Sequence, residues 1–142
     1  MDDYEQYEKD CERIRKENET LLKGFEKELQ KVNLSPKIIK KHIFNIDCFL
    51  NNYLLYSEAI NAAAGITEIW GYLGDFFIRK CMWSTPAQIK HNATSFKKFY
   101  SYMEDVGKVS KDELEAMNFE IKTFLPMWVE TVEEYNNPDD DE

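Results

Sequence analysis

The sequence predicts an all-α protein: a bundle of about four to five helices, preceded by a long amino-terminal helix. Three observations predict this class. Apolar residues recur at steps of three and four in successive segments, and hardly any segment alternates apolar and polar residues as a strand would. A third observation is that helix-start and helix-stop residues separate these segments. With 142 residues, 43% of them hydrophobic, the chain is long enough to bury a core.

The first expected helix covers about residues 3–31. Its seam positions follow a heptad pattern and are Tyr4, Tyr7, Cys11, Ile14, Asn18, Leu21, Phe25 and Val32. Such a seam either packs on the chain's own domain or joins helices of two chains. An interior Asn fixes register in coiled-coil dimers, but Glu28 falls where the next apolar residue should be and Gly24 weakens the helix, so we expect the helix to lie against its own domain. The candidate interaction residues are Tyr7, Ile14, Asn18 and Leu21.

A second helix is expected to begin at Ser35, a good N-cap, with Pro36 in its first turn. Its apolar stripe comprises Ile39, Ile43, Ile46, Leu50 and Tyr53. Three lysines, Lys37, Lys40 and Lys41, lie in its first turns, where the helix dipole disfavours cations by some tenths of a kcal/mol each. They are either solvated charges tolerated at this small cost or residues that contact an anionic partner.

After a linker of small residues at 59–67, the segment 68–83 is apolar over a wide arc and predicts the most buried helix. Gly71 and Gly74 lie three residues apart in it, and each costs about 1 kcal/mol relative to Ala in a helix. We expect them to permit close helix packing rather than to cradle a phosphate.

A fourth helix should run from Thr85, which has capping-box spacing to Gln88, to a stop at Gly107. The apolar face of this helix comprises Ile89, Ala93, Phe96, Phe99, Tyr100 and Met103. The polar face comprises Lys90, Thr94, Lys97 and Ser101, with Lys98 beside it.

A last helix should begin at Ser110, which has the same capping-box spacing to Glu113. Its inward residues are Leu114, Met117, Ile121, Leu125, Trp128 and Val132. Residues 136–142 have no apolar content, and we expect them to form a disordered acidic tail.

Charge is unevenly distributed along the chain. The formal net charge of −9 argues against nucleic acid as a partner. However, residues 36–100 hold eight Lys/Arg against four Asp/Glu, while residues 101–142 hold three against thirteen. The middle of the chain is therefore basic. The candidate nucleic-acid-binding residues are Lys37, Lys40, Lys41, Lys90, Lys97 and Lys98.

No catalytic or metal-binding motif is evident, and we expect a protein that is not an enzyme, with no cofactor and no small-molecule substrate. Neither His42 nor His91 has a second metal ligand at helical spacing. Three cysteines lie far apart in the sequence, which indicates reduced thiols. No apolar run is long enough to span a membrane and no signal peptide is evident, so the expected location is the cytoplasm.

Three stretches in order, "LSPKIIKKHIFNIDCFLNNYL", "ITEIWGYLGDFF" and "TPAQIKHNATSFKKFYSYMEDVGKVS", resemble the amino-terminal core-binding domain of tyrosine recombinases, the phage-integrase family. The resemblance covers about residues 33–112. It implies a SAM-like bundle that clamps DNA, with its first and fourth helices at the major groove. By position these are the two helices that carry the six lysines. Nothing in the chain corresponds to the family's catalytic domain.

The expected organisation is a long helix with possible coiled-coil pairing at 1–32, a recombinase-like core at 33–135 and the tail at 136–142. Two functions fit this organisation. One is a non-catalytic module that binds duplex DNA through a lysine face. The alternative is a protein-interaction or homodimerisation module that uses the heptad helix. The chain is also compatible with being one segment of a longer protein that holds an activity elsewhere.

Overall fold

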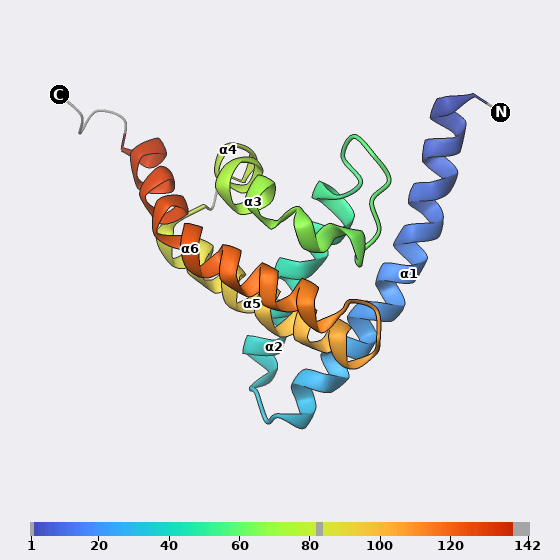
Figure 1. The fold of residues 1–142 in the computed structure, drawn as a ribbon, viewed down its shortest axis with the longest axis horizontal. Coiled ribbons are helices and arrows are strands. Elements are labelled where there is room, and N and C mark those ends of the chain that lie inside the picture. Colours follow the sequence, from blue (N-terminus) through green and yellow to red (C-terminus); the bar gives the residue numbers. More distant parts are fainter. Residues whose placement is uncertain (1, 82–83, 138–142) are drawn as a thin grey trace. The chain divides into compact units, whose positions relative to one another are not determined.

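The computed structural model describes residues 2–81 and 84–137, and in these ranges the regular elements are all helices and no strand occurs (Figure 1). The prediction of an all-α bundle is confirmed. In chain order the elements are α1 (Asp3–Lys31), α2 (Pro36–Asp47), a π-helical turn η1 (Cys48–Tyr53), a 3₁₀ turn η2 (Ala64–Thr67), α3 (Ile69–Gly71), a second π-helical turn η3 (Tyr72–Phe76), α4 (Phe77–Lys80), α5 (Pro86–Asp105) and α6 (Lys111–Asn136).

The chain forms two compact units, Met1–Gly65 and Ile66–Glu142. This division differs from the expected one, which set residues 1–32 apart and joined residues 33–135 in a single core. The physical reason is that α1 packs on α2 and η1 and so belongs to the first unit. The last five residues of the expected tail, 138–142, lie outside the described residues.

Unit 1 is a helical hairpin. α1 ends at Lys31, and Asn33 in the connection has a positive φ of 60°, which turns the chain toward α2. The Ser35 hydroxyl accepts the N–H of Ile38 at 3.3 Å, as expected of an N-cap. α2 and η1 then run back along α1. Asn51 of η1 contacts Asn18 in the middle of α1, and Leu55 contacts the first half of α1. Ile39, Ile46, Phe49 and Leu50 are buried.

Unit 2 is built around the pair α5 and α6, with α3, η3 and α4 packed on α6. The six residues assigned to the inner face of α5 are all buried, and the Phe96 ring meets the edge of Tyr72 at 6.0 Å between centroids. Trp128 of α6 is completely buried. Trp70 remains 38% exposed although it belongs to the apolar arc of its segment, and it contacts Phe124 and Trp128 edge-on.

The ends of the unit 2 helices follow the predicted signals. The Thr85 hydroxyl accepts the N–H of Gln88 at 3.1 Å. Gly107 has a φ of 77°, which stops α5. Ser110 and Glu113 form a complete capping box, with reciprocal bonds of 3.0 and 2.9 Å. None of the helices in the described ranges is long and apolar enough to cross a bilayer.

Candidate nucleic-acid and interaction surfaces

The first surface lies at the start of α2 and consists of Lys37, Lys40 and Lys41; we refer to it as the α2 lysine surface. All three side chains are exposed. The first turn of α2 has no acidic residue to offset them. Cations in this position interact unfavourably with the helix dipole, so they gain most from an anionic partner outside the helix.

The second surface lies on α5 and consists of Lys90, Lys97 and Lys98; we refer to it as the α5 lysine surface. Lys90 and Lys97 are exposed, and Lys98 is half-buried. The apolar face of α5 fixes this orientation, because the residues on it fill the core of unit 2 and leave the lysine side to solvent. The sequence therefore predicted correctly which side of α5 faces the solvent.

The ion pairs of the described residues involve other cations. Arg13, Lys16, Lys23 and Lys31 pair with carboxylates of α1, and Arg79 pairs with Asp75. None of the six candidate lysines pairs with a carboxylate in the described part of the chain. The guanidinium of Arg79 binds Asp75 through two bonds, of 2.6 and 3.1 Å, and holds the pKa of that carboxyl below its usual value.

The six lysines divide equally between the two units, three on α2 in unit 1 and three on α5 in unit 2. Each surface is therefore formed within one unit. The expectation that the two surfaces join into a single positive face stays a prediction.

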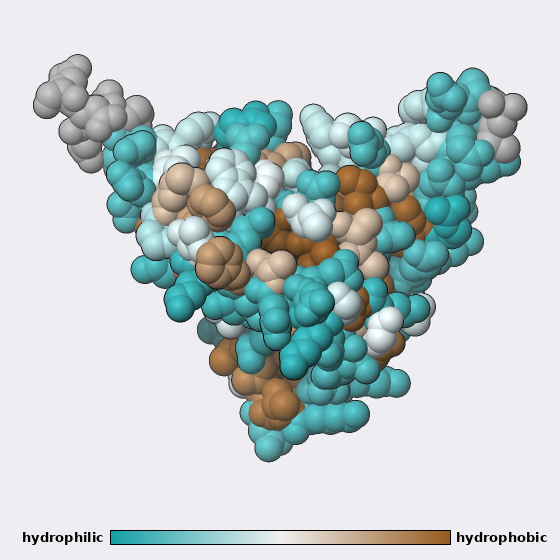
Figure 2. All heavy atoms as spheres, viewed as in Figure 1, coloured by the Kyte–Doolittle hydropathy of each residue, from teal (hydrophilic) through white to brown (hydrophobic). Residues whose placement is uncertain are grey.

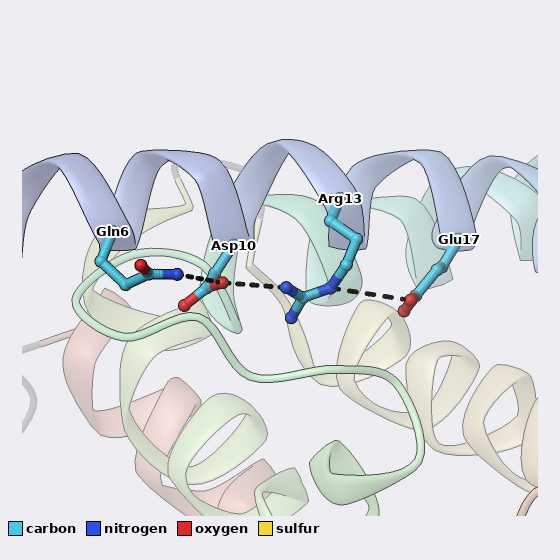
Figure 3. A network of polar contacts seen from close by, with 4 residues as sticks. All are labelled: Gln6, Asp10, Arg13 and Glu17. Atoms are coloured by element: carbon cyan, nitrogen blue, oxygen red, sulfur yellow. Dashed lines mark hydrogen bonds and ion pairs between the residues drawn. The ribbon is translucent and has the colours of Figure 1, made fainter. Parts of the chain in front are cut away.

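Arg13 of α1 is already engaged with neighbouring carboxylates of the same helix. Figure 3 shows Gln6 and Arg13 donating to the same oxygen of Asp10, at 3.0 and 2.9 Å, while the Nε of Arg13 lies 3.9 Å from Glu17. Such exposed pairs, three and four residues apart, each stabilise a helix by a few tenths of a kcal/mol. They also mean that a phosphate would have to compete with Asp10 for Arg13.

The predicted interaction residues of α1 are largely engaged inside unit 1. Ile14 is buried in a cluster with Cys11 and Leu55, and the Tyr7 hydroxyl donates to the carbonyl of Leu55. The buried Asn18 donates from Nδ2 to Asn51 Oδ1 at 2.8 Å. Leu21 is half-buried. A dimer through this seam would have to replace these contacts, because the chain's own helix occupies the seam.

Sequence reasoning missed a groove of about 520 Å³ in unit 1, between the end of α1 and the start of α2. Its lining residues are Glu26, Gln30, Asn33, Leu34, Pro36, Ile39, Lys40 and Ile43. Figure 2 shows hydrophobic residues gathered beside hydrophilic ones over the turn between α1 and α2. Asn33 is of a residue type that tolerates its positive φ, but the groove forms where the end of one helix meets the start of the next and has no signal in the sequence.

Few side chains in the described ranges are grouped in a way that suits metal binding or catalysis. No cluster of three or more His, Cys, Asp or Glu side chains that could hold a metal occurs in the described ranges. His42 is buried. Cys81 is half-buried, and this burial raises the pKa of its thiol. Compared with protein-family models, with curated proteins and with solved structures, the chain gives no significant match to any of them.

Proposed function

We propose that this chain is a non-catalytic helical module that binds duplex DNA through phosphate contacts from its two lysine surfaces. The observation that carries this proposal is that each surface groups three lysines that have no ion pair in the described residues, whereas four of the seven cations of α1 pair with carboxylates of their own helix. An unpaired lysine gives up no protein contact when it meets a phosphate, and it displaces a condensed counterion from the DNA.

The resemblance to recombinase core-binding domains also supports DNA contact by the two helices that carry these lysines. It covers about residues 33–112, and its three stretches span α2 with η1, the segment from η2 to η3, and α5. Its first and fourth helices correspond to α2 and α5, which carry the lysines. Lysines that contact phosphates give sequence-independent binding, so we expect a module that recognises the duplex backbone rather than particular bases.

The expected strength is modest and depends on salt. Six phosphate contacts would give a slope of about −5 in a plot of log affinity against log salt concentration. The acidic remainder of the chain, which leaves a net charge of −9, lowers the affinity further at low salt.

Fluorescence anisotropy with a duplex of about 20 base pairs tests this proposal at low salt. The variants Lys90→Glu/Lys97→Glu and Lys37→Glu/Lys41→Glu should each weaken binding and reduce the salt slope by about two. The matched control, Lys108→Glu/Lys122→Glu, changes the net charge equally at exposed positions outside both surfaces. Undetectable binding of the unmodified chain, or equal weakening by all three variants, would contradict the proposal.

The alternative function, a protein-interaction or homodimerisation module that uses the α1 seam, has less support. Three of its four named residues, Tyr7, Ile14 and Asn18, contact their own unit.

A further inference from the structure

Unit 1 is charge-polarised along α1. Residues 2–12 hold six Asp/Glu and one Lys, a net charge of −5, whereas residues 23–41 hold six Lys and two Glu, a net charge of +4. α1 spans 29 residues, so at 1.5 Å per residue its two ends lie roughly 40 Å apart. This separation is several Debye lengths at physiological salt, and the two ends of one copy therefore do not neutralise each other.

The basic end of unit 1 contains the groove. Leu34, Ile39 and Ile43 provide apolar lining, and Lys40 and Glu26 line it as well. A groove of this size and composition suits one or a few bulky side chains that carry negative charge beside them. Lys37, Lys40 and Lys41, which have no ion pair in the described part of the chain, supply the charge complement.

The acidic end of unit 1 offers such a side chain. Tyr4 is 67% exposed in the first turns of α1, and its nearest carboxylates in sequence are Asp3, Glu5 and Glu8. Its ring lies 6.4 Å from that of Tyr7, so two aromatic rings sit together there. Tyrosines frequently anchor interfaces, because they bury a large apolar area at low entropic cost.

We propose that the acidic first turns of α1 dock in the groove at the basic end of a second copy, so that copies associate head to tail. Tyr4 then covers the apolar lining of the groove, and the carboxylates around it face the α2 lysine surface of that second copy. The contact joins two different patches, so each copy keeps one free end and association can continue to a third copy. The proposal does not depend on DNA binding, although duplex DNA would compete for the same α2 lysines.

Sedimentation velocity on a chain that begins at residue 1, in the absence of DNA, tests the contact. Glu5→Lys/Glu8→Lys alters only the acidic end and keeps the N-cap Asp2, whose carboxylate accepts the N–H of Glu5 at 2.8 Å. Lys37→Glu/Lys40→Glu alters only the basic end. The two matched controls make the same charge changes on exposed residues of unit 2: Glu133→Lys/Glu134→Lys and Lys108→Glu/Lys122→Glu.

The unmodified chain should show a weight-average sedimentation coefficient that rises with concentration, and about 0.5 M salt should weaken the association at least about tenfold. Each end variant alone should be monomeric, whereas both controls should still associate. An equimolar mixture of the two end variants should form a discrete dimer and nothing larger, because that mixture has one competent acidic end and one competent groove for each pair.

Tyr4→Ala should weaken association of the otherwise unmodified chain without changing its helical circular dichroism, since Tyr4 is 67% exposed. The proposal is overturned if the unmodified chain is monomeric at all concentrations in low salt, or if the mixed end variants stay monomeric. A dimer that is indifferent to all of these substitutions would indicate another interface and would overturn it equally.

Discussion

Glu120 of α6 is a half-buried carboxylate whose Oε1 atom is shielded from solvent and has no hydrogen-bond partner among the described residues. It lines a hollow of about 150 Å³ with Ile66, Thr67, Glu113 and Met117, among others. Burial raises the pKa of the Glu120 carboxyl, and a hydrogen bond from the backbone of Trp70 opposes part of this rise. Its charge is therefore unfavourable where it sits.

We expect Glu120→Gln to raise the urea midpoint of unfolding at pH 7. A carboxyl whose pKa is higher in the folded state than its ordinary 4.5 ionises more easily after unfolding, so stability falls as the pH rises through that raised pKa. The gain of the variant should shrink below about pH 4, where both states are protonated. Glu115→Gln, an exposed position of the same helix, is the control. A gain at pH 7 that persists undiminished in acid, or that the control equals, would contradict the explanation.

Residue-scale features such as this one were not predictable from the sequence. Glu120 belongs to a helix with many acidic residues, and nothing in its neighbours along the chain distinguishes it from Glu115. The same holds for Asn18. The heptad position of Asn18 is apparent in the sequence, but its partner Asn51 lies 33 residues away and is brought to it only by the hairpin of unit 1.

At the scale of elements, the close contact between η3 and α6 depends on Gly74. A Cβ atom added there would lie 2.7 Å from Trp128 Nε1 and 2.9 Å from Trp128 Cδ1, well inside van der Waals contact. Trp128 is fully buried and cannot move aside easily. The sequence-based expectation that this glycine serves packing agrees with the observed contact.

Gly74→Ala should lower the free energy of unfolding by about 1–3 kcal/mol because of overpacking. The intrinsic preference for Ala in a helix would by itself act in the opposite direction by up to about 1 kcal/mol. Urea denaturation measures the change through the midpoint at constant m value. In a Trp128→Phe background, where the smaller ring leaves room, the cost should fall by at least about 0.5 kcal/mol. An equal cost in both backgrounds would show that the indole is not what excludes the methyl group.

The helix boundaries were the best predicted feature at this scale, because local chemistry sets them. Ser35, Thr85 and Ser110 each bond the backbone N–H three residues on, and Gly107 adopts the conformation that ends α5. The π-helical turns η1 and η3 had no such signal. Within the heptad helix, Glu28 interrupts the apolar pattern, and the core is instead continued by Leu29, four residues after Phe25.

At the scale of the whole molecule, the distribution of charge opposes the proposed DNA contact. The net charge is −9, and four of the acidic residues are Asp139, Asp140, Asp141 and Glu142. α6 ends at Asn136, so a chain that stops at residue 137 keeps all of the helices in the described residues. Such a chain has a net charge of −5.

We expect removal of residues 138–142 to increase duplex affinity at low salt, because a less negative protein is repelled less by the phosphates. The difference should fade as salt screens it. A full-length chain with Asn or Gln at these four acidic positions separates charge from length and should behave like the truncated chain. If only the truncation increases affinity, charge is not the cause.

The sequence by itself determined the helical class, the starts of α2, α5 and α6, the end of α5 and the side of α5 that is buried, because capping and the 3.6-residue period act within a few residues of the chain. Only the tertiary structure decided that α1 joins α2 in one compact unit, that Asn18 meets Asn51 and that a groove opens beside Lys40. These features arise where segments distant in sequence pack together, and the free energy of packing side chains across such a distance is not encoded in any local pattern.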